Sequence, residues 1–369
     1  MMEFENFLPQ ILERINAAVH QQSELGKESF EVSAKRYMDD KLFVEEMNLF
    51  SRVPMPILPV GDLPKNGAFV AVANGKQSFL VARDKDGIVR VFRNRCRHRG
   101  AKLLEDGEVY RGLVACPYHA WSYDTSGALK SIYGKNHGIE DWQTLSLQEV
   151  PSFIAGGFIW ADPENRRSIF DDFGKEISLL GIGAPRIVSE FQHEGNFNWK
   201  TGVEAFLEVY HFKPAHGKKL GALPIHSVAV FDFSADFSRI IVPLSSDHYQ
   251  TLACIKRNCH IMYFIFPNHF LLVFEDHFGW LTVQPQTIDR GVLKYRGLTF
   301  NQRADEHLDK RIQESVLFLK ELMMEDVIIC NSIQQGMRLS DSFHLTRYEP
   351  AIAHFHKRLD EEFSSATCR

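Results

Sequence analysis

The sequence has few cysteines, no long apolar run and no excess of basic residues. Six cysteines in 369 residues are too few for a disulfide framework, so a cysteine near a histidine is tested first as a metal ligand. The longest apolar runs, at about 153–161 and 261–266, fall far short of the roughly 20 residues that span a bilayer, and we expect no membrane segment. Acidic side chains outnumber basic ones by 47 to 42. This balance argues against a dedicated nucleic-acid binder, which presents a basic surface.

The N-terminus and the overall composition are those of an ordinary globular protein. The opening MMEFENFLPQ has two acidic residues where a secretory signal has a basic region, and no apolar stretch follows, so we expect a cytoplasmic location. Apolar residues make up 44% and charged residues 24% of the chain, which excludes a disordered, collagen-like or coiled-coil protein. Two excesses require an explanation: the chain has 16 His but only six Cys, and 29 Phe but only 10 Tyr.

Hydrophobic patterns divide the chain into regions. Apolar side chains in residues 4–15 fall on one face of a helix. From about 54 to 163, short apolar runs separated by Gly, Asp and Asn predict a small all-β domain. A second β-rich stretch covers about 187–299, with one helical segment near 199–212, and residues 302–337 then carry a long helix.

Two pairs of metal-binding side chains lie in the first β-rich region. Cys96 is paired with His98, and Cys116 with His119, with seventeen residues between the pairs. Zinc is the first alternative, because thiolate and imidazole both suit it. Structural zinc sites usually pair Cys with Cys and His with His, whereas each pair here contains one of each. Two Cys on one iron and two His on the other form a Rieske 2Fe-2S cluster, which this spacing favours.

These residues resemble the pattern C-x-H-R-G…C-P-Y-H-x-W of the Rieske non-heme iron oxygenases. The resemblance implies that Cys96, His98, Cys116 and His119 hold a 2Fe-2S cluster. Ala120 stands where many members have Gly, a change that we expect to be tolerated. Because both Cys are ligands, no disulfide joins the two loops, and a low-potential electron acceptor is implied. The matching residues are Cys96, His98, Arg99, Gly100, Cys116, Pro117, Tyr118, His119 and Trp121.

A second group of candidate ligands interrupts the later β-rich stretch. Glu204, Glu208 and His211 are spaced i, i+4 and i+7, so on a helix they share one face. Pro214 is expected to end that helix and to let His216 approach His211. The alternative is a solvated polar face. Apolar neighbours favour burial instead, and a buried polar face needs partners or a metal.

The third ligand has to come from elsewhere in the chain. Two His and one carboxylate form the facial triad of non-heme Fe(II) oxygenases, which leaves positions open for O2 and substrate. Asp326 lies in the apolar stripe of the long helix, at −4 from Cys330 and +7 from Leu319, where an unpaired charge would be costly. We therefore predict His211, His216 and Asp326 as iron ligands, with Glu325 as the alternative carboxylate.

This segment resembles the motif E-N-x-x-D-x-Y-H-x4-H of the same family. Glu204, Tyr210, His211 and His216 occupy matching positions, while Glu208 replaces the usual Asp. The resemblance implies catalytic roles for Glu204, Glu208 and Tyr210. The family Asp bridges a Rieske His of a neighbouring subunit to a mononuclear His, and the carried-over path is His119–Glu208–His211. A Glu here is similar to the branch that oxidises quaternary ammonium compounds, although it is not confined to that branch.

The resemblance implies an α+β fold with two kinds of domain. Residues 51–165 are expected to form an all-β Rieske 2Fe-2S domain. Residues 166–369 are expected to form a helix-grip (START-like) catalytic domain, built on an antiparallel sheet and holding the mononuclear iron. Residues 1–50 are expected to contribute N-terminal helices that pack on the catalytic domain.

The implied activity is that of a terminal oxygenase component. A separate NAD(P)H-dependent reductase or ferredoxin supplies electrons through the cluster, and mononuclear Fe(II) activates O2. The small organic substrate is hydroxylated or oxidatively demethylated. A head-to-tail homotrimer brings one subunit's cluster beside the next subunit's iron. The alternatives are a non-catalytic Rieske electron carrier or ligand-binding protein, and a zinc protein.

The sequence leaves the substrate open between an aromatic compound and a quaternary ammonium compound. Residues 231–278 are dense in Phe, which mostly reflects core packing. Some of these rings could line an apolar pocket, or could form a cation–π cage. We assign no role to four other histidines, His193, His260, His269 and His277, nor to Cys254 and Cys259.

Overall fold

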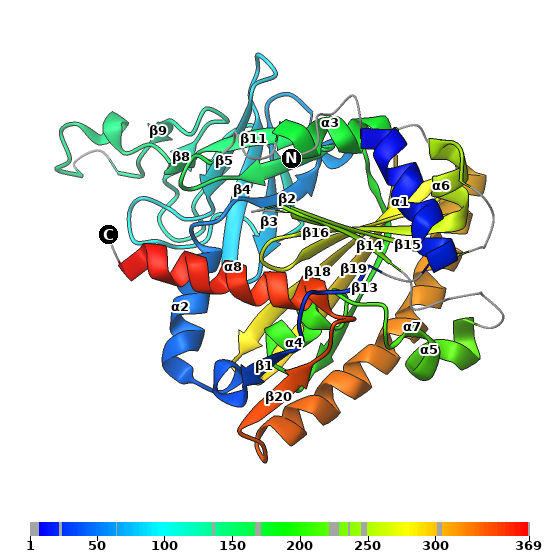
Figure 1. Cartoon of the computed structure of the whole chain (residues 1–369). Coiled ribbons are helices and arrows are strands. Elements are labelled where there is room, and N and C mark those ends of the chain that lie inside the picture. The colour runs from blue at the N-terminus through cyan, green and yellow to red at the C-terminus, as the bar shows by residue number, and fades with distance from the viewer. Residues whose placement is uncertain are drawn as a thin grey trace. The chain divides into compact units, whose positions relative to one another are not determined.

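The computed structural model divides the chain into two compact units (Figure 1). The smaller unit is Ser51–Arg186, and the larger unit joins Met1–Phe50 to Ile187–Arg369. Within the ranges that the structure describes, no helix is long and apolar enough to cross a membrane. These ranges are 7–21, 24–63, 65–134, 137–166, 171–220, 229–234, 237–244, 249–300 and 305–367.

The smaller unit is built almost entirely from short antiparallel strands, as predicted. A five-stranded sheet has the order β10-β5-β4-β3-β6, and two three-stranded sheets have the orders β7-β8-β9 and β11-β12-β2. The described part of the unit also contains one α-helix, α3 (Asp171–Leu179), and two short 3-10 helices, Val60–Asp62 and Trp142–Thr144. The strands are β2 (Met55–Pro59), β3 (Ala68–Asn74), β4 (Gln77–Arg83), β5 (Val89–Arg93), β6 (Val109–Arg111), β7 (Val114–Ala115), β8 (Ser122–Tyr123), β9 (Leu129–Ser131), β10 (Glu149–Val150), β11 (Ser152–Ala155) and β12 (Phe158–Ala161).

The larger unit is organised around one seven-stranded antiparallel sheet, with the order β13-β19-β18-β17-β16-β15-β14. The predicted α+β class, with an all-β domain and a large antiparallel-sheet domain, is confirmed. The strands are β13 (Ile187–Gly195), β14 (Val230–Phe233), β15 (Phe237–Pro243), β16 (Cys259–Ile265), β17 (His269–Val273), β18 (His277–Thr287) and β19 (Arg290–Thr299).

The long helix α7 (Glu306–Met337) packs against this sheet at β13 and β19 (Figure 1). Asp305 caps it by accepting hydrogen bonds from the N–H groups of the first turn. Close packing depends on Gly297 of β19, where an added Cβ would lie 2.5 Å from Val316 and 2.7 Å from Ile312. The predicted helix is confirmed, and Asp326 lies in its buried stripe. Its proposed first residues, 302–304, lie outside the described residues.

The N-terminal segment joins the larger unit. Helix α1 (Phe7–Gln21) buries Ile11 and Ile15, which confirms the amphipathic helix, while Phe4 lies outside the described residues. Strand β1 (Phe30–Ser33) pairs with β20 (Ser342–Leu345). Helix α2 (Asp40–Phe50) brings Glu46 to Lys200, and this buried pair joins α2 to the segment that follows β13.

Two further helices of the larger unit are α6 (Leu252–Asn258) and α8 (Pro350–Thr367).

The predicted continuous helix near 199–212 is wrong. Helix α4 (Trp199–Glu204) ends at Glu204, and α5 (Phe212–Leu220) begins after a stretch of turns. Glu208 lies in this stretch and accepts a hydrogen bond from the His211 N–H at 3.0 Å, which satisfies a donor at the start of α5. Pro214 does not end a helix. It is the third residue of α5, where its missing N–H costs no helical hydrogen bond.

Candidate metal centres

Three candidate ligand side chains converge in the larger unit. His211 lies in the turn directly before α5, His216 lies within α5, and Asp326 comes from α7. One ligand atom from each lies within 4.8 Å of the others. Asp326 Oδ1 is 2.9 Å from His216 Nε2 and 3.6 Å from His211 Nε2. Such a set of two imidazoles and one carboxylate suits a divalent iron with open coordination positions.

In each of the two histidines, a glutamate contacts the ring nitrogen that faces away from Asp326. The Nδ1 atom of His211 contacts the carboxylate of Glu208, and the Nδ1 atom of His216 lies 2.8 Å from Glu325 Oε2. Both Nε2 atoms are thereby turned towards Asp326. Carboxylates placed in this way fix the tautomer of a metal-binding His and raise its basicity. Glu325, the alternative ligand from the sequence, thus contacts the nitrogen that faces away from Asp326.

The electrostatics of the three side chains are those of a site prepared for a cation. Burial disfavours the charged form of His211, but hydrogen bonds to Asp326 and Glu208 outweigh it and raise its pKa to about 9. The pKa of His216 is raised in the same way. Burial opposes ionisation of Asp326, yet the two imidazoles keep its pKa below the ordinary value. A metal ion would replace the protons that these groups share.

Two other residues predicted for this site lie apart from the three ligands. Glu204 accepts a hydrogen bond from the Tyr37 hydroxyl at 2.7 Å and lies 3.1 Å from His356 Nε2. Tyr210 is 46% exposed and stacks on Tyr348, with ring centroids 4.9 Å apart. Two cavities adjoin the candidate ligands and are described next. Glu204 lines one of them, and Tyr210 lines neither.

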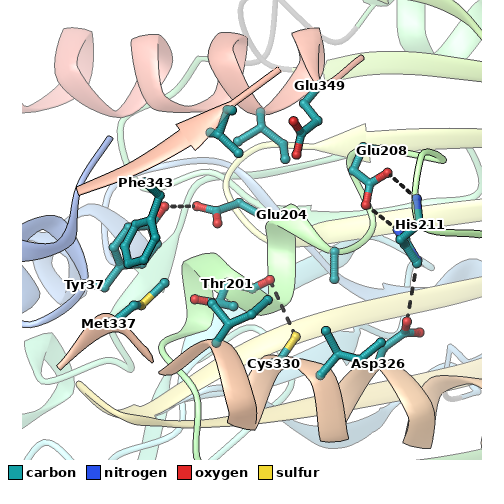
Figure 2. Close-up of a pocket in the computed structure, with 15 residues that line it drawn as sticks. Tyr37, Thr201, Glu204, Glu208, His211, Asp326, Cys330, Met337, Phe343 and Glu349 are labelled. Atoms are coloured by element: carbon teal, nitrogen blue, oxygen red, sulfur yellow. Dashed lines mark hydrogen bonds and ion pairs between the residues drawn. The ribbon is translucent and has the colours of Figure 1, made fainter. Parts of the chain in front are cut away.

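Two cavities meet at His211 and Asp326. The first, which we call the acidic cavity, has a volume of about 300 Å³ and is lined by the carboxylates of Glu204, Glu208 and Glu349. Figure 2 shows these carboxylates around one space, with Asp326 below them. Burial raises the pKa of Glu349. The other residues that line the acidic cavity, besides His211 and Asp326, are Tyr37, Thr201, Ala205, Ile329, Cys330, Ile333, Met337, Phe343, Leu345 and Ile352.

The second cavity, which we call the apolar cavity, has a volume of about 200 Å³. Its lining comes from the sheet, from α5 and from α7, and four of its side chains are Phe. The three candidate iron ligands are among its lining residues. The remaining lining residues are Phe206, Phe212, Leu220, Leu244, His260, Met262, Leu272, Phe274, Phe318, Leu319, Leu322 and Met323.

The smaller unit carries the two Cys/His pairs on matching loops. In the first loop the N–H of Gly100 donates to the Cys96 carbonyl at 3.0 Å, and in the second the N–H of Ala120 donates to the Cys116 carbonyl at 2.9 Å. Both residues at the ends of these turns have positive φ, 79° for Gly100 and 54° for Ala120. Ala120 thus occupies the left-handed conformation that favours glycine.

The four side chains of these loops fit an iron–sulfur cluster. Cys96 and Cys116 are buried free thiols, and burial raises the pKa of Cys96. The rings of His98 and His119 have centroids 4.8 Å apart. The Nδ1 atom of His119 is buried without a hydrogen-bond partner in the described part of the chain. A buried nitrogen without a hydrogen-bond partner is costly unless a metal binds it.

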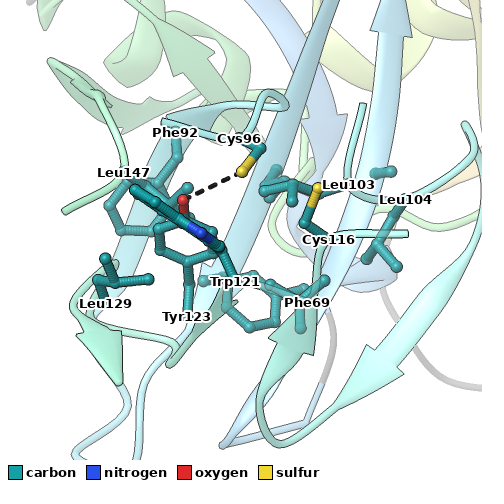
Figure 3. Packing of buried hydrophobic residues seen from close by; sticks show 14 residues of the cluster. Phe69, Phe92, Cys96, Leu103, Leu104, Cys116, Trp121, Tyr123, Leu129 and Leu147 are labelled. Atoms are coloured by element: carbon teal, nitrogen blue, oxygen red, sulfur yellow. Dashed lines mark hydrogen bonds between the residues drawn. The ribbon is translucent and has the colours of Figure 1, made fainter. Parts of the chain in front are cut away.

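A tyrosine supports one of the two thiols. The Tyr123 hydroxyl lies 3.3 Å from Cys96 Sγ and accepts the Arg97 N–H at 3.0 Å. Figure 3 shows this contact in the apolar cluster around both Cys. A hydrogen bond to a ligand sulfur is one of the features that set the potential of such clusters. No sequence signal beyond the proximity of Tyr123 to the motif indicated this contact.

The sequence matches two family models. Residues 53–150 match the Rieske [2Fe-2S] domain, and residues 184–365 match the ring hydroxylating alpha subunit (catalytic domain). The two Cys/His loops therefore lie within the match to the Rieske domain. His211, His216 and Asp326 lie within the match to the catalytic domain.

Several curated relatives are oxygenase subunits. The glycine betaine monooxygenase oxygenase subunit of Chromohalobacter salexigens is 28% identical over 51% of this chain and 43% of the relative. The carnitine monooxygenase oxygenase subunit of Escherichia coli K12 is 26% identical over 52% of this chain and 53% of the relative. The anthranilate 1,2-dioxygenase large subunit of Acinetobacter baylyi is 27% identical over 51% and 42%. The matches thus span about half the length of these relatives.

Solved structures share the fold over nearly the whole chain. A quaternary ammonium Rieske monooxygenase in complex with L-carnitine has a TM-score of 0.75 at 17% identity, covering 94% of this chain and 98% of that one. Naphthalene 1,2-dioxygenase from Rhodococcus sp. has a TM-score of 0.74 at 17% identity, covering 98% of both chains. With both family models matched and both metal-site motifs inside them, this chain belongs to the Rieske non-heme iron oxygenases, with the domain composition of their catalytic alpha subunit.

Proposed function

We propose that this protein is the terminal oxygenase of a reductase-dependent system and that it hydroxylates or oxidatively demethylates a small apolar, aromatic substrate. The observation that carries the proposal is the convergence of His211 and His216 on Asp326 at the wall of an apolar cavity. A non-catalytic electron carrier would not need this ligand set, in which each imidazole is also oriented by its own glutamate.

The residues have distinct proposed tasks. His211, His216 and Asp326 would hold the iron, while Cys96, His98, Cys116 and His119 would hold the 2Fe-2S cluster. When bound, the iron supplies activation of O2 and the cluster supplies electrons one at a time. The protein itself orients the imidazoles, excludes water with apolar walls and positions the substrate beside the three ligands.

The proposed electron path runs from His119 of one subunit through Glu208 to His211 of the next, which requires a homotrimer or a similar closed ring. Glu208 already contacts Nδ1 of His211. Electrons would come from NAD(P)H through a separate reductase or ferredoxin, in the cytoplasm. Glu204 is proposed to support this region through Tyr37 and His356, and Tyr210 through its stack on Tyr348.

The lining of the apolar cavity favours an aromatic substrate. Asp326, a candidate iron ligand, is the one carboxylate among the described residues that line it. Besides Asp326, the described lining contains three histidines, four Phe side chains and several Leu and Met side chains. An apolar cavity of about 150 Å³ can hold a benzene molecule, so a volume of about 200 Å³ suits a single substituted ring.

A quaternary ammonium compound is the second candidate. Two observations favour it: Glu208 stands at the bridging position, and relatives at 26–28% identity are named as betaine and carnitine monooxygenases. The Phe side chains could also contact a cation through their faces. The apolar cavity nevertheless lacks a described basic side chain that would pair with the carboxylate of carnitine or betaine.

The test is coupled consumption of NADH and O2 with a reductase, measured for substituted arenes, glycine betaine and carnitine. We expect stoichiometric product from an arene and none from the Asp326→Asn variant. Product from a betaine alone would replace the aromatic proposal and leave the oxygenase proposal intact. Absence of coupled product from every compound, in protein that holds both metal centres, would contradict the oxygenase proposal.

A further inference from the structure

His260 is a polar side chain in the apolar cavity. It lies on β16, and both His260 and Met262, two residues farther along, line the cavity, as the alternation of a strand requires. Among the described lining residues, the other polar side chains are the three candidate iron ligands. If the other three bind the metal, His260 is the polar side chain among these described lining residues that remains available to a substrate.

Each of the other histidines of the sheet has at least one hydrogen-bonding contact, although Nε2 of His269 is buried without one among the described residues. His193 contacts the Lys320 carbonyl at 2.7 Å, and His269 Nδ1 accepts from Trp280 Nε1 at 3.0 Å. His277 contacts Asp276 at 2.7 Å. For His260, the described residues offer only two aromatic contacts, to Phe212 and Phe274, with ring centroids 6.3 and 6.2 Å away.

An imidazole in such surroundings is neutral and has both ring nitrogens available to a ligand. Burial lowers the pKa of His260 to about 4, so at neutral pH one ring nitrogen donates and the other accepts. No hydrogen bond joins His260 to another described residue, so a correctly placed ligand atom can form one with either ring nitrogen. The half-buried ring reaches open space through the cavity that it lines.

His260 also lies within reach of the metal ligands across one aromatic ring. The Phe212 ring lies 6.3 Å from the His260 ring and 5.1 Å from the His211 ring. The imidazoles of His260 and His211 therefore cannot be farther apart than the sum of these two distances. Both residues line the apolar cavity, so a ligand that fills it can contact both.

We propose that His260 determines substrate specificity, by hydrogen-bonding a neutral hydroxyl, ether or carbonyl oxygen on a small aromatic substrate. This inference rests on the proposed function, because it assumes that the apolar cavity is where the substrate binds. His260 is a positioning residue in this account. Its hydrogen bond fixes which carbon of the ring faces the three candidate iron ligands, and it takes no part in the oxygen chemistry.

The test compares phenol with toluene, which differ by a hydroxyl in place of a methyl group. Dissociation constants are measured by calorimetry on the metal-loaded protein, without reductase, for wild type and His260→Leu. We expect His260→Leu to weaken phenol binding roughly ten-fold, as the loss of one hydrogen bond predicts, and to change toluene binding less than two-fold. The matched control, Met262→Leu on the same strand, should alter both constants alike.

Several outcomes would overturn the proposal. Equal changes for phenol and toluene in His260→Leu would show that His260 has only a structural role, and the aromatic proposal would stand. Wild type supplies a second test that needs no variant. An apolar cavity without a partner binds phenol more weakly than toluene, because the hydroxyl loses its water. We expect phenol to bind at least as tightly, and ten-fold weaker binding would refute the hydrogen bond.

The result for betaines separates this inference from the proposed function. Binding of glycine betaine or carnitine with no binding of either arene would overturn the aromatic substrate class and the role of His260 together. If both arenes bind but His260→Leu does not discriminate between them, only the role of His260 fails. His260→Gln, which keeps a donor and an acceptor, is expected to restore most of the preference for phenol.

Discussion

Glu325 Oε2 lies 2.8 Å from Nδ1 of His216, on the opposite side of the ring from the nitrogen that faces Asp326. Two adjacent acidic residues of α7 thus contact the two nitrogens of one imidazole. Asp326 is buried, whereas Glu325 is partly exposed and also lies 3.4 Å from Lys219 Nζ. In the proposed site Asp326 would bind the metal, and Glu325 would orient the imidazole of His216.

Removal of the orienting carboxylate should weaken iron binding without abolishing it. We expect Glu325→Ala to lower the affinity for mononuclear iron by roughly 10–100-fold, because His216 loses the partner that fixes its tautomer. Iron affinity is measured by competition with a chelator, and the cluster absorbance should stay unchanged. The control is Glu321→Ala, an exposed residue one turn earlier on α7. Equal affinity for Glu325→Ala and Glu321→Ala would contradict the orienting role.

Glu208 is expected to matter for turnover more than for metal content. Glu208→Gln keeps a hydrogen-bonding side chain at His211 but removes the negative charge from the proposed path between the two centres. We expect both metals to remain and product formation to fall to a few per cent or less. Metal analysis and product yield per NADH are measured on the same preparation. Coupled turnover close to that of wild type would show that the path does not depend on this carboxylate.

The second cluster loop carries strain that a single substitution should relieve. Ala120 has a φ of 54°, which costs a residue with a Cβ about 1–2 kcal/mol. Ala120→Gly removes this cost and adds some freedom to the unfolded chain, so we expect a net gain of about 0.5–1 kcal/mol. The midpoint for thermal loss of cluster absorbance should rise by roughly 2–4 °C.

The neighbouring strand provides the control for this substitution. Ala115→Gly in β7 introduces glycine where the backbone is extended, so it should lower the same midpoint. A fall for Ala120→Gly as well would mean that the left-handed turn is not strained.

Tyr123 should tune the cluster. Tyr123→Phe removes the hydroxyl 3.3 Å from Cys96 Sγ, and a hydrogen bond to a ligand sulfur stabilises the reduced, more negative cluster. A net loss of roughly 1 kcal/mol corresponds to a potential lower by about 40 mV for one electron. Redox titration followed by EPR gives the potential. An unchanged or higher value would show that the hydroxyl does not donate to this sulfur.

The motifs could be read from the sequence where the ligands are close together in the chain. Cys96 with His98 and Cys116 with His119 are local pairs, so spacing alone predicted them. Asp326 is remote, but a carboxylate in an apolar helical stripe is costly, and this cost marked it as a ligand. The domain boundary predicted at 165–166 stays a prediction.

Other features depend on contacts that no local pattern encodes. Residues 199–212 have good helix formers, yet Glu208 turns back to His211 and a new helix begins at Phe212. Periodicity places His260 on a strand, but the cavity beside it is formed by α5 and α7 packing over that face. Sequence spacing likewise leaves Glu325 as an alternative ligand, because it does not distinguish which imidazole nitrogen of His216 a carboxylate meets.

The most direct test of the account is EPR with iron quantitation on one preparation, before and after reduction by dithionite and with nitric oxide as a probe of Fe(II). We predict a Rieske signal on reduction, three irons per chain in total, and a separate high-spin signal from nitric oxide at mononuclear Fe(II) that disappears in Asp326→Asn. A Rieske signal with only two irons per chain, in protein prepared with excess Fe(II), would contradict the central claim. A colourless preparation containing zinc would contradict both metal assignments.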